Sequence, residues 1–273
     1  SRGLGDVYKR QVEEFYSIIG KALGMEYFYI GDISSGNHWI EWGKDKTGKY
    51  AGKYKVILSK TPILQSKEFA LEGKGWTHSS TIRIETKIKN KELTFYSLHI
   101  PGSAGVVEGS VMKNLVDVVL MKDTSKRIIV MGDFNDYPNN KSIRKILEAE
   151  APPIRSDSLD IAIHPATSPS SLSPLKLYHL LARKAKTANF GSYKYHGEWG
   201  LLDHLIVSGT LLNTSGNFFT REEKAKVCQL PFLLTDDKKY GGKEPFRTYK
   251  GMKYQGGFSD HLPIYTDFEL VLP

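Results

Sequence analysis

The feature that most constrains the fold is a short apolar run, Ile128 to Met131, which ends at Gly132. Four consecutive large apolar residues without alternation are typical of a strand buried on both faces. A glycine that lets the backbone turn then precedes Asp133, Asn135 and Asp136. Ligands of open α/β sheets bind beyond the carboxyl ends of the strands, so Asp133 and Asn135 are expected to face a cleft. The alternative is an ordinary turn, because Asn and Asp are common turn residues.

Length and composition bound the possible classes of protein. The chain of 273 residues is long enough for one large domain or two small ones, and its 40% hydrophobic and 25% charged residues are ordinary for a globular protein. No apolar run approaches the roughly 20 residues that cross a bilayer. The single cysteine, Cys228, excludes an internal disulfide and a cysteine zinc cluster, but it does not fix the compartment. The net charge of +8 favours polyanionic partners such as nucleic acid.

The segment Ser1 to Gln11 needs separate treatment because it shows no clear periodicity and no initiating Met. It resembles a translated sequencing adapter of the kind that contaminates assembled metagenomic genes, so we exclude it from the fold. We expect residues 12–273 to form a single domain whose native N-terminus lies further upstream. The alternative is a genuine, weakly ordered terminus.

Hydrophobic periodicity predicts the elements of the remaining chain. Helices are expected over Glu13–Leu23 with Gly24 as a C-terminal cap, Val111–Val119, Ser142–Glu150 and, as a turn or two, Leu177–Lys184. Strands are expected over Met25–Ile30, Lys55–Lys60, Thr81–Ile88, Leu93–Ile100, Leu205–Val207 and Ile264–Leu270, with a hairpin turn at Asn90-Lys91 and another strand entered at Gly191–Tyr193. Long loops are expected over Pro152–Pro174 and Lys238–Tyr254. Many strands with few helices favour two packed sheets with helices outside.

Four short stretches share one property, a strand end that presents His, Asp or Asn. They are Leu98–Pro101, Gly132–Asn135, Leu202–His204 and Ser259–His261. One such residue is more often structural, but four recurrences in one chain are much less expected by accident. An Asp-His pair combines a metal ligand with an imidazole that binds phosphate or moves a proton. Carboxylates without Cys suit a hard cation such as Mg²⁺, which implies metal-assisted hydrolysis of a phosphoester.

Together with Ile57–Pro62, these motifs resemble the endonuclease/exonuclease/phosphatase superfamily, the deoxyribonuclease-I-like hydrolases. The resemblance extends from about Val12 to the C-terminus. The run Gly191–Trp199 is similar to members from Bacteroidetes-type bacteria that are usually described only as endonucleases. The resemblance implies an α/β, four-layer sandwich: two face-to-face mixed β-sheets with helices on the outer faces and the site at one edge of the sheets.

The resemblance also implies roles for individual residues. Asp133 would orient and activate the attacking water, and Asn135 would hold a phosphate oxygen or that water. His261 would contact the scissile phosphate, and Asp203 would position its ring. His99 would lie where nuclease members place a second catalytic His or a Tyr.

The implied metal is Mg²⁺ or Mn²⁺, and Asp260 would help to bind it. The family's other metal-binding residue is a Glu that follows a Gln near the N-terminus, whereas Gln11 is followed here by Val12. We therefore expect that this Glu was lost at the adapter junction, which leaves an inactive truncated enzyme as one alternative. Gly102 also departs from the Ser or Asn that many members have after their His-x-Pro.

The loop Lys238–Tyr254 carries six basic residues against one acidic residue, with aromatic residues between them. Cations meet phosphates and aromatic rings stack on bases, so Arg247 and Lys250 are predicted to bind substrate together with Asn135 and His261. The alternative is a solvated loop whose aromatic rings pack inward.

The function predicted from these features is that of a divalent-metal-dependent phosphodiesterase, a monomer that acts as an endonuclease or exonuclease on nucleic acid. One alternative is a phosphatase or phosphodiesterase of the sugar, inositol or sphingomyelin type, acting on small molecules or lipid head groups. Another, from a different class, is a non-catalytic nucleic-acid-binding protein.

Overall fold

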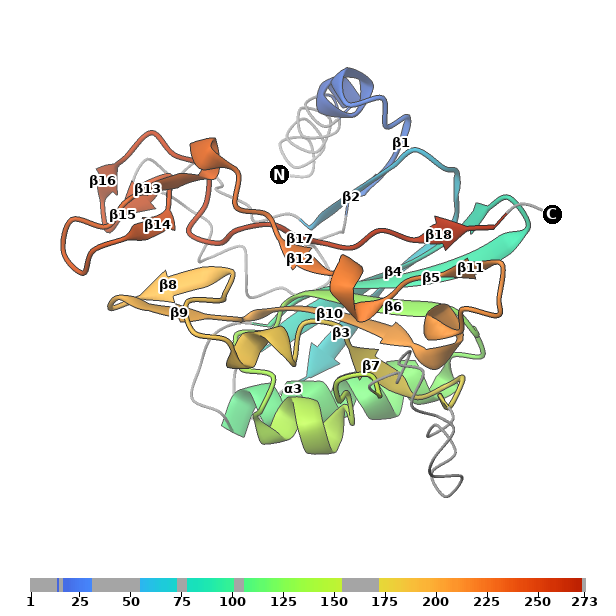
Figure 1. The fold of residues 1–273 in the computed structure, drawn as a ribbon. Helices are drawn as coiled ribbons and strands as arrows, with labels where there is room; N and C mark the ends of the chain where they lie inside the picture. The colour runs from blue at the N-terminus through green and yellow to red at the C-terminus, as the bar shows by residue number, and fades with distance from the viewer. Residues whose placement is uncertain are drawn as a thin grey trace.

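A computed structural model of the chain describes Glu14 and residues 17–30, 55–72, 78–100, 106–153 and 172–271. Its centre is a six-stranded mixed sheet with the strand order β3-β4-β5-β6-β10-β7 (Figure 1). The strands are β3 (Ile63–Glu72), β4 (His78–Ile88), β5 (Lys91–His99), β6 (Ile128–Asp133), β10 (Asp203–Ser208) and β7 (Leu177–His179). Strands β5 and β6 are parallel and every other neighbouring pair is antiparallel.

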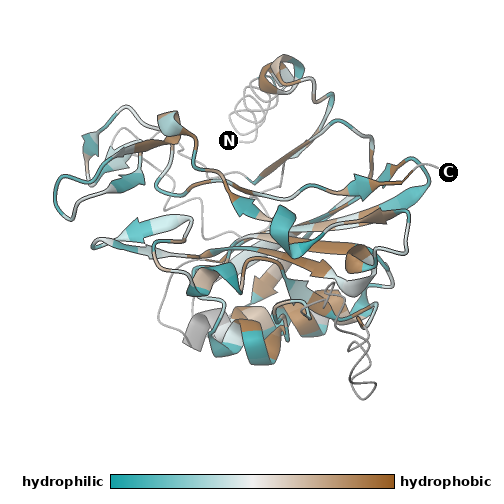
Figure 2. Cartoon of the chain, in the orientation of Figure 1, coloured by the Kyte–Doolittle hydropathy of each residue, from teal (hydrophilic) through white to brown (hydrophobic). Residues whose placement is uncertain are grey.

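A helical layer covers one face of this sheet (Figure 1). Helix α3 (Val106–Asn114) continues through η2 (Leu115–Val119) and η3 (Leu120–Lys122), and η4 (Ser142–Ile146) packs beside it. The chain needs such a crossover because parallel strands cannot be joined by a tight turn. Figure 2 shows apolar residues, in brown, both on the central strands and on the helical layer. Fully buried side chains of both layers meet there, among them Val130, Met112, Leu115 and Ile143.

Short strand pairs cover the opposite face. They are β11 (Phe218–Phe219) with β18 (Glu269–Leu270) and β12 (Lys226–Val227) with β17 (Ile264–Tyr265). Their apolar residues pack on a second core that includes Ile129, Leu205 and Val207 from β6 and β10. A further pair, β1 (Tyr27–Ile30) with β2 (Val56–Ser59), lies next to β3. The α/β class is therefore confirmed, and among the described residues the second layer consists of separate strand pairs.

Two segments extend from one end of the sheet (Figure 1). The first is the hairpin of β8 (Tyr193–Tyr195) and β9 (Glu198–Gly200). The second, which we call the basic lobe, spans residues 234–254 and contains β13 (Leu234–Asp236), β14 (Lys243–Pro245), β15 (Tyr249–Lys250) and β16 (Lys253–Tyr254). The segment predicted as the loop Lys238–Tyr254 thus contains short hairpins.

The buried side chain of Lys194 joins the hairpin to the basic lobe. Its Nζ lies 2.9 Å from Asp237 Oδ2 and donates to the Gly241 carbonyl at 2.8 Å. The two charged side chains are only 5% and 4% exposed. An ion pair so well shielded from water holds its geometry better than a surface pair.

Several predicted elements are confirmed with shifted ends, and others are wrong. The helical turn predicted over Leu177–Lys184 is wrong, because residues 177–179 form β7 and pair with β10; only η6 (Lys184–Lys186) is helical. The helix predicted over Ser142–Glu150 ends at Ile146, and Glu150 instead forms a β-bridge with Tyr178.

The remaining differences concern strands. Strand β3 was missed, because its polar and apolar residues do not alternate and it pairs on one side only, with β4. The predicted closing strand is divided into β17 and β18. The hairpin turn lies one residue earlier than predicted, at Lys89 with a φ of 52°. Gly24, with a φ of +65°, caps the first helix as predicted, and Met25 N–H bonds to the Gly20 carbonyl.

Some predictions fall outside the described part of the chain. These are the adapter-like segment Ser1–Gln11, Gly102, and residues 154–171 of the predicted long loop. The single domain over residues 12–273 likewise stays a prediction. No helix in the described ranges is long and apolar enough to cross a membrane.

Candidate active site

Gly132 lies inside β6, one residue before its end. It pairs with Leu98 of β5 on one side and His204 of β10 on the other. Its φ is +135°, and a Cβ at this position would collide with the Leu98 carbonyl oxygen. Glycine is therefore required for the close approach of two strands, and the expectation that it turns the chain was wrong.

The turn itself is made by Asp133 and Asn135. Asp133 Oδ1 accepts the Asn135 backbone N–H at 2.8 Å, and Asn135 has a φ of 49°, which Asn tolerates better than most residues. The Asn135 Nδ2 donates to the Ile100 carbonyl at 2.6 Å and lies 3.3 Å from Asp133 Oδ2. The alternative of an Asx turn is thus correct as geometry. The same turn also lines the cavity described below.

Asp203 begins β10 directly opposite Asp133 at the end of β6. Its Oδ2 accepts two hydrogen bonds, one from Nδ1 of His261 at 2.7 Å and one from Oγ of Ser192 at 2.5 Å. The backbone of His261 is itself held by a bridge to Tyr193. Asp203 therefore orients the His261 ring, as the resemblance implied. Nε2 is the other nitrogen of that ring.

The surroundings shift two pKa values at this edge of the sheet. Burial, together with the negative charges of Asp203 and Asp260, raises the pKa of Asp133 to about 6, although the Asn135 N–H bond and His261 act in the opposite direction. Burial alone would lower the pKa of His261, but the hydrogen bond and charge of Asp203 outweigh it, so that pKa is raised. A carboxyl that titrates near neutral pH beside a readily protonated imidazole suits acid–base chemistry.

One cavity of about 680 Å³ brings the predicted core of the site together. Its lining includes every predicted catalytic and metal-binding residue: His99, Asp133, Asn135, Asp203, Asp260 and His261. His99 Nε2 lies 3.8 Å from Asp133 Oδ2. The sequence prediction missed the other lining residues, which are Tyr137, Tyr193, Tyr195, Leu202 and Ser259.

The two basic residues predicted to bind substrate do not line the cavity. Arg247 lies close enough to Tyr193 for its charge to act on the pKa of that hydroxyl. Its Nε is buried without a hydrogen-bond partner among the described residues. Lys250 lies on the surface of the basic lobe, 3.6 Å from Glu244.

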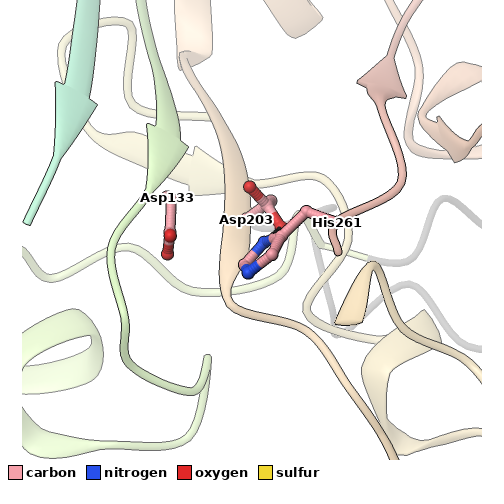
Figure 3. A group of neighbouring side chains, drawn as sticks. All are labelled: Asp133, Asp203 and His261. Carbon is pink, nitrogen blue, oxygen red and sulfur yellow. Dashed lines mark hydrogen bonds and ion pairs between the residues drawn. The ribbon is translucent and has the colours of Figure 1, made fainter. Parts of the chain in front are cut away.

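The donor set is suited to a divalent cation. Ligand atoms of Asp133, Asp203 and His261 lie within 4.8 Å of one another (Figure 3). Asp260, the predicted metal ligand, is outside this close group but lines the same cavity. Carboxylate oxygens are the ligands that Mg²⁺ and Mn²⁺ prefer, and a cation would oppose the burial and the carboxylate charges that raise the pKa of Asp133. Asp203 Oδ2 accepts two hydrogen bonds and Asp133 Oδ1 accepts one, so Asp260, the predicted ligand, is the better candidate to hold the metal.

A pair of fully buried histidines supports the site from below. His204 Nε2 bonds to the Asp136 carbonyl at 2.9 Å, and His204 Nδ1 lies 2.8 Å from His179 Nε2. His179 Nδ1 accepts the Leu181 backbone N–H at 3.1 Å. Burial lowers the pKa of both rings, that of His204 to about 4. Phe134 stacks on His204 with ring centroids 4.7 Å apart, so the turn after β6 rests on this pair.

The site residues that the sequence prediction missed lie near the predicted motifs or in a run already noted in the sequence. Ser192, Tyr193 and Tyr195 belong to the run Gly191–Trp199, which was noted for its resemblance alone. Tyr137 follows Asn135 by two positions. Aromatic residues close in sequence to Asp-His and Asp-x-Asn motifs are thus candidates for cavity walls.

A sheet that carries Asp, Asn and His residues at the ends of neighbouring strands defines the chain as a phosphoester hydrolase. A family model described as "Endonuclease/Exonuclease/phosphatase family" matches residues 80–270. The chain therefore belongs to this family, as the motifs indicated. Comparison with curated protein sequences found no significant match.

Solved structures with a similar fold come from distant relatives. The TDP2 protein of D. rerio, complexed with a single-strand DNA product, is 11% identical, with a TM-score of 0.51 over 98% of this chain and 90% of that chain. The mannosyl-6-phosphatase Bt3783 of Bacteroides thetaiotaomicron is 15% identical, with a TM-score of 0.47 over 81% and 73%. The human nocturnin catalytic domain with bound sulfate is 13% identical, with a TM-score of 0.46 over 94% and 76%. At these identities the similarity concerns the fold alone.

Proposed function

We propose that this enzyme is a divalent-metal-dependent phosphodiesterase that hydrolyses nucleic acid and acts as a monomer. The observation that carries the proposal is the proximity of the Asp133 carboxylate to the Asp203–His261 pair in one cavity. A half-buried carboxyl whose pKa is raised to about 6 suits an enzyme that activates water better than it suits a binding protein.

The attacking water is held by Asp133 and Asn135. Both N–H groups of the Asn135 amide point to protein oxygens, those of Ile100 and Asp133, which leaves the Asn135 Oδ1 without a partner among the described residues. An amide oxygen accepts hydrogen bonds, so it suits a water molecule and not a phosphate oxygen. Of the two roles considered for Asn135, the geometry therefore favours water. Asp133 takes the proton as the water attacks.

His261 acts on the phosphate. Its Nδ1–H is fixed on Asp203, so in the charged form its Nε2–H is the donor available to the cavity. The raised pKa keeps the ring protonated at a higher pH than usual, which suits a donor to a phosphoryl oxygen that gains charge in the transition state. A divalent metal held at Asp260 would supply further neutralisation of that charge.

Nucleic acid is the favoured substrate because of charge and shape. The chain carries a net charge of +8, and the basic lobe lies beside the β8–β9 hairpin, joined to it by Lys194. Three tyrosines line the cavity, which suits a substrate with planar groups next to its phosphates.

The experiment compares several substrates in the presence and absence of a divalent metal. The 273-residue chain is incubated with plasmid, single-stranded and duplex oligonucleotides, bis(p-nitrophenyl) phosphate and p-nitrophenyl phosphate, in Mg²⁺, Mn²⁺ or EDTA. The Asp133→Asn variant tests the site, because its amide oxygen can still accept the Asn135 N–H and preserve the turn. The matched control is Asp117→Asn, an exposed carboxylate of the helical layer paired with Lys113.

We expect metal-dependent cleavage of the oligonucleotides that Asp133→Asn reduces and Asp117→Asn retains. Turnover of p-nitrophenyl phosphate alone would instead identify a phosphomonoesterase. Tight oligonucleotide binding without turnover of any substrate would identify a binding protein or an inactive enzyme. Either result would contradict the proposal.

A further inference from the structure

A row of aromatic rings leads outward from the cavity along the β8–β9 hairpin. Tyr193 lies against His261 with ring centroids 4.8 Å apart, and the Tyr195 ring follows 6.3 Å from that of Tyr193, at an interplanar angle of 13°. His196 stacks on Tyr195 at 4.0 Å, and Tyr240 of the basic lobe lies 6.0 Å beyond it. We call Tyr193, Tyr195, His196 and Tyr240 the aromatic row. It connects the His261 end of the cavity to the surface.

The row follows from strand geometry. Tyr193 and Tyr195 are two positions apart in β8, so their side chains leave the same face about 6.6 Å apart. Lys194 lies between them, on the opposite face, where it is buried in its contact with Asp237. A Cβ on Gly197, whose φ is +89°, would lie 2.9 Å from the Tyr240 Cβ, so glycine allows the hairpin and the basic lobe to meet closely. The rings are thus held by backbone pairing and a buried ion pair.

The row is exposed where a ligand would meet it. Tyr195 is 60% and Tyr240 45% exposed. Exposed aromatic rings that form a continuous row beside a polar cavity indicate a ligand-binding surface. Aromatic residues scattered singly over a surface carry no such indication. His261, to which the proposed function assigns the phosphate, lies at one end of the row, so the ligand group that stacks on the row would be covalently close to the phosphate.

We propose that an unpaired nucleobase, adjacent to the scissile phosphate, stacks in the aromatic row on the face of Tyr195 that His196 does not cover. This inference rests on the proposed function, since it names the part of a nucleic acid that the site recognises. A base inside a duplex has both faces covered by its neighbours, so only a single strand, an overhang or a frayed end offers a free face. The enzyme would accordingly prefer single-stranded substrates or single-stranded ends.

The chemistry along the row favours a base over a sugar ring. Sugar sites fix hydroxyl groups with precisely placed polar side chains, whereas beyond His261 the row offers flat rings and tyrosine hydroxyls. Positive charge lies on its outer side: Lys239 Nζ is 4.8 Å from the Tyr240 ring centroid. Close to its inner end, the buried Nε of Arg247 lacks a hydrogen-bond partner among the described residues. Phosphates on either side of the stacked base would meet these cations.

The test uses a fluorescent base and does not depend on catalysis. Single-stranded oligonucleotides that carry 2-aminopurine are titrated with the protein in EDTA, because stacking quenches this base. The wild type is compared with Tyr195→Leu, which removes the ring, and Tyr195→Phe, which keeps it. Tyr265→Leu is the control, since Tyr265 is an exposed tyrosine of β17 outside the cavity and the row.

We expect quenching by the wild type, Tyr195→Phe and Tyr265→Leu, and little quenching by Tyr195→Leu, with affinity about 5- to 150-fold weaker. In Mg²⁺, the ratio of kcat/KM for a normal over an abasic oligonucleotide should fall toward one in Tyr195→Leu. Quenching without hydrolysis of any substrate would retain the stacking site and reject the proposed activity. Hydrolysis with equal quenching by wild type and Tyr195→Leu would reject the stacking site alone, as would a preference for sugar phosphates that Tyr195→Leu leaves unaltered.

Discussion

The His261 ring and the Asp203 carboxylate form a 2.7 Å hydrogen bond across 58 residues of sequence. Asp203 reaches this position because β10 pairs with β6 and begins opposite Asp133. His261 reaches it through the bridge between its backbone and Tyr193. A carboxylate on Nδ1 sets the tautomer and the orientation of the imidazole, so the pair acts as one unit.

Replacement of Asp203 should therefore damage catalysis more than binding. In Asp203→Asn we expect kcat on the single-stranded oligonucleotide to fall roughly 10²- to 10⁴-fold, because the amide cannot stabilise a charged His261. KM should change much less. Ser192→Ala removes only the second donor to Asp203 and should cost less than about tenfold. A kcat loss no larger in Asp203→Asn than in Ser192→Ala would contradict the role given to the pair.

Metal binding should appear in thermal unfolding as well as in activity. A cation that binds only the folded state stabilises it, by about 2.7 kcal/mol at a concentration 100 times its Kd. Addition of Mg²⁺ or Mn²⁺ to the EDTA-treated chain should therefore raise Tm, and Asp260→Ala should reduce the increase. Asp117→Asn should keep the full increase, because its carboxylate lies away from the cavity. An equal increase in both variants would place the cation elsewhere.

Gly132 should tolerate no side chain. In Gly132→Ala the new Cβ collides with the Leu98 carbonyl between two paired strands, and we expect the free energy of unfolding to fall by at least about 2 kcal/mol. Gly241→Ala is a matched control, because Gly241 also has a positive φ, +81°, but nothing lies within 4 Å of its Cβ position. Urea unfolding measures both. A similar loss in the two variants would mean that backbone conformation, and not the strand contact, requires glycine at position 132.

Asp123 should make stability depend on acid pH. Burial would raise the pKa of Asp123, but hydrogen bonds from Arg83, Ser125 and Tyr96 outweigh it and lower that pKa from 3.8 to about 2. Its side chain is 2% exposed, and Arg83 Nε donates to it at 2.9 Å. A carboxyl with a lowered folded-state pKa stabilises the fold above its unfolded pKa, and the contribution is lost as pH falls from about 3.8 to about 2.

For Asp123→Asn we therefore expect a loss of about 2 kcal/mol at pH 7 that shrinks as pH falls through this window. Urea unfolding at pH 7 and at several values between 4 and 2 measures the difference from wild type. The exposed Asp117→Asn should stay within about 0.5 kcal/mol throughout. A difference for Asp123→Asn that is independent of pH would show that its packing, and not its charge, matters.

The sequence was most informative where apolar residues run or alternate without interruption. The buried run of β6 and the alternation of β4, in which Ile82 and Ile84 face the core, predict their strands directly. Strand β7 was mistaken for a helix because three residues carry too little periodicity, and its pairing with β10 decides its conformation. Strand β3 was missed because an edge strand need not alternate.

The site was likewise predicted best where the sequence carries a clear local pattern. Asp133, Asp203 and His261 stand in short motifs, and the cavity brings them together as expected. The tyrosines of the cavity lining were not predicted, because Tyr193 becomes a neighbour of His261 only through a backbone bridge between distant segments, and Tyr195 lies beyond Tyr193. Arg247 and Lys250 were chosen for their charge, and neither lines the cavity, because charge composition does not specify where a surface loop folds.

The buried histidines beneath the site fix the direction of the hydrogen bonds that they make. The Asp136 carbonyl can only accept, so His204 must carry its proton on Nε2, and its Nδ1 then accepts from His179 Nε2. His179 is left with a bare Nδ1, which is what the Leu181 N–H requires. Three hydrogen bonds thus run head to tail, and each ring has one allowed tautomer. An added proton on either ring would place two hydrogen-bond donors opposite each other. The turn that carries Asp133 is therefore held by a chain of hydrogen bonds that can run in one direction only.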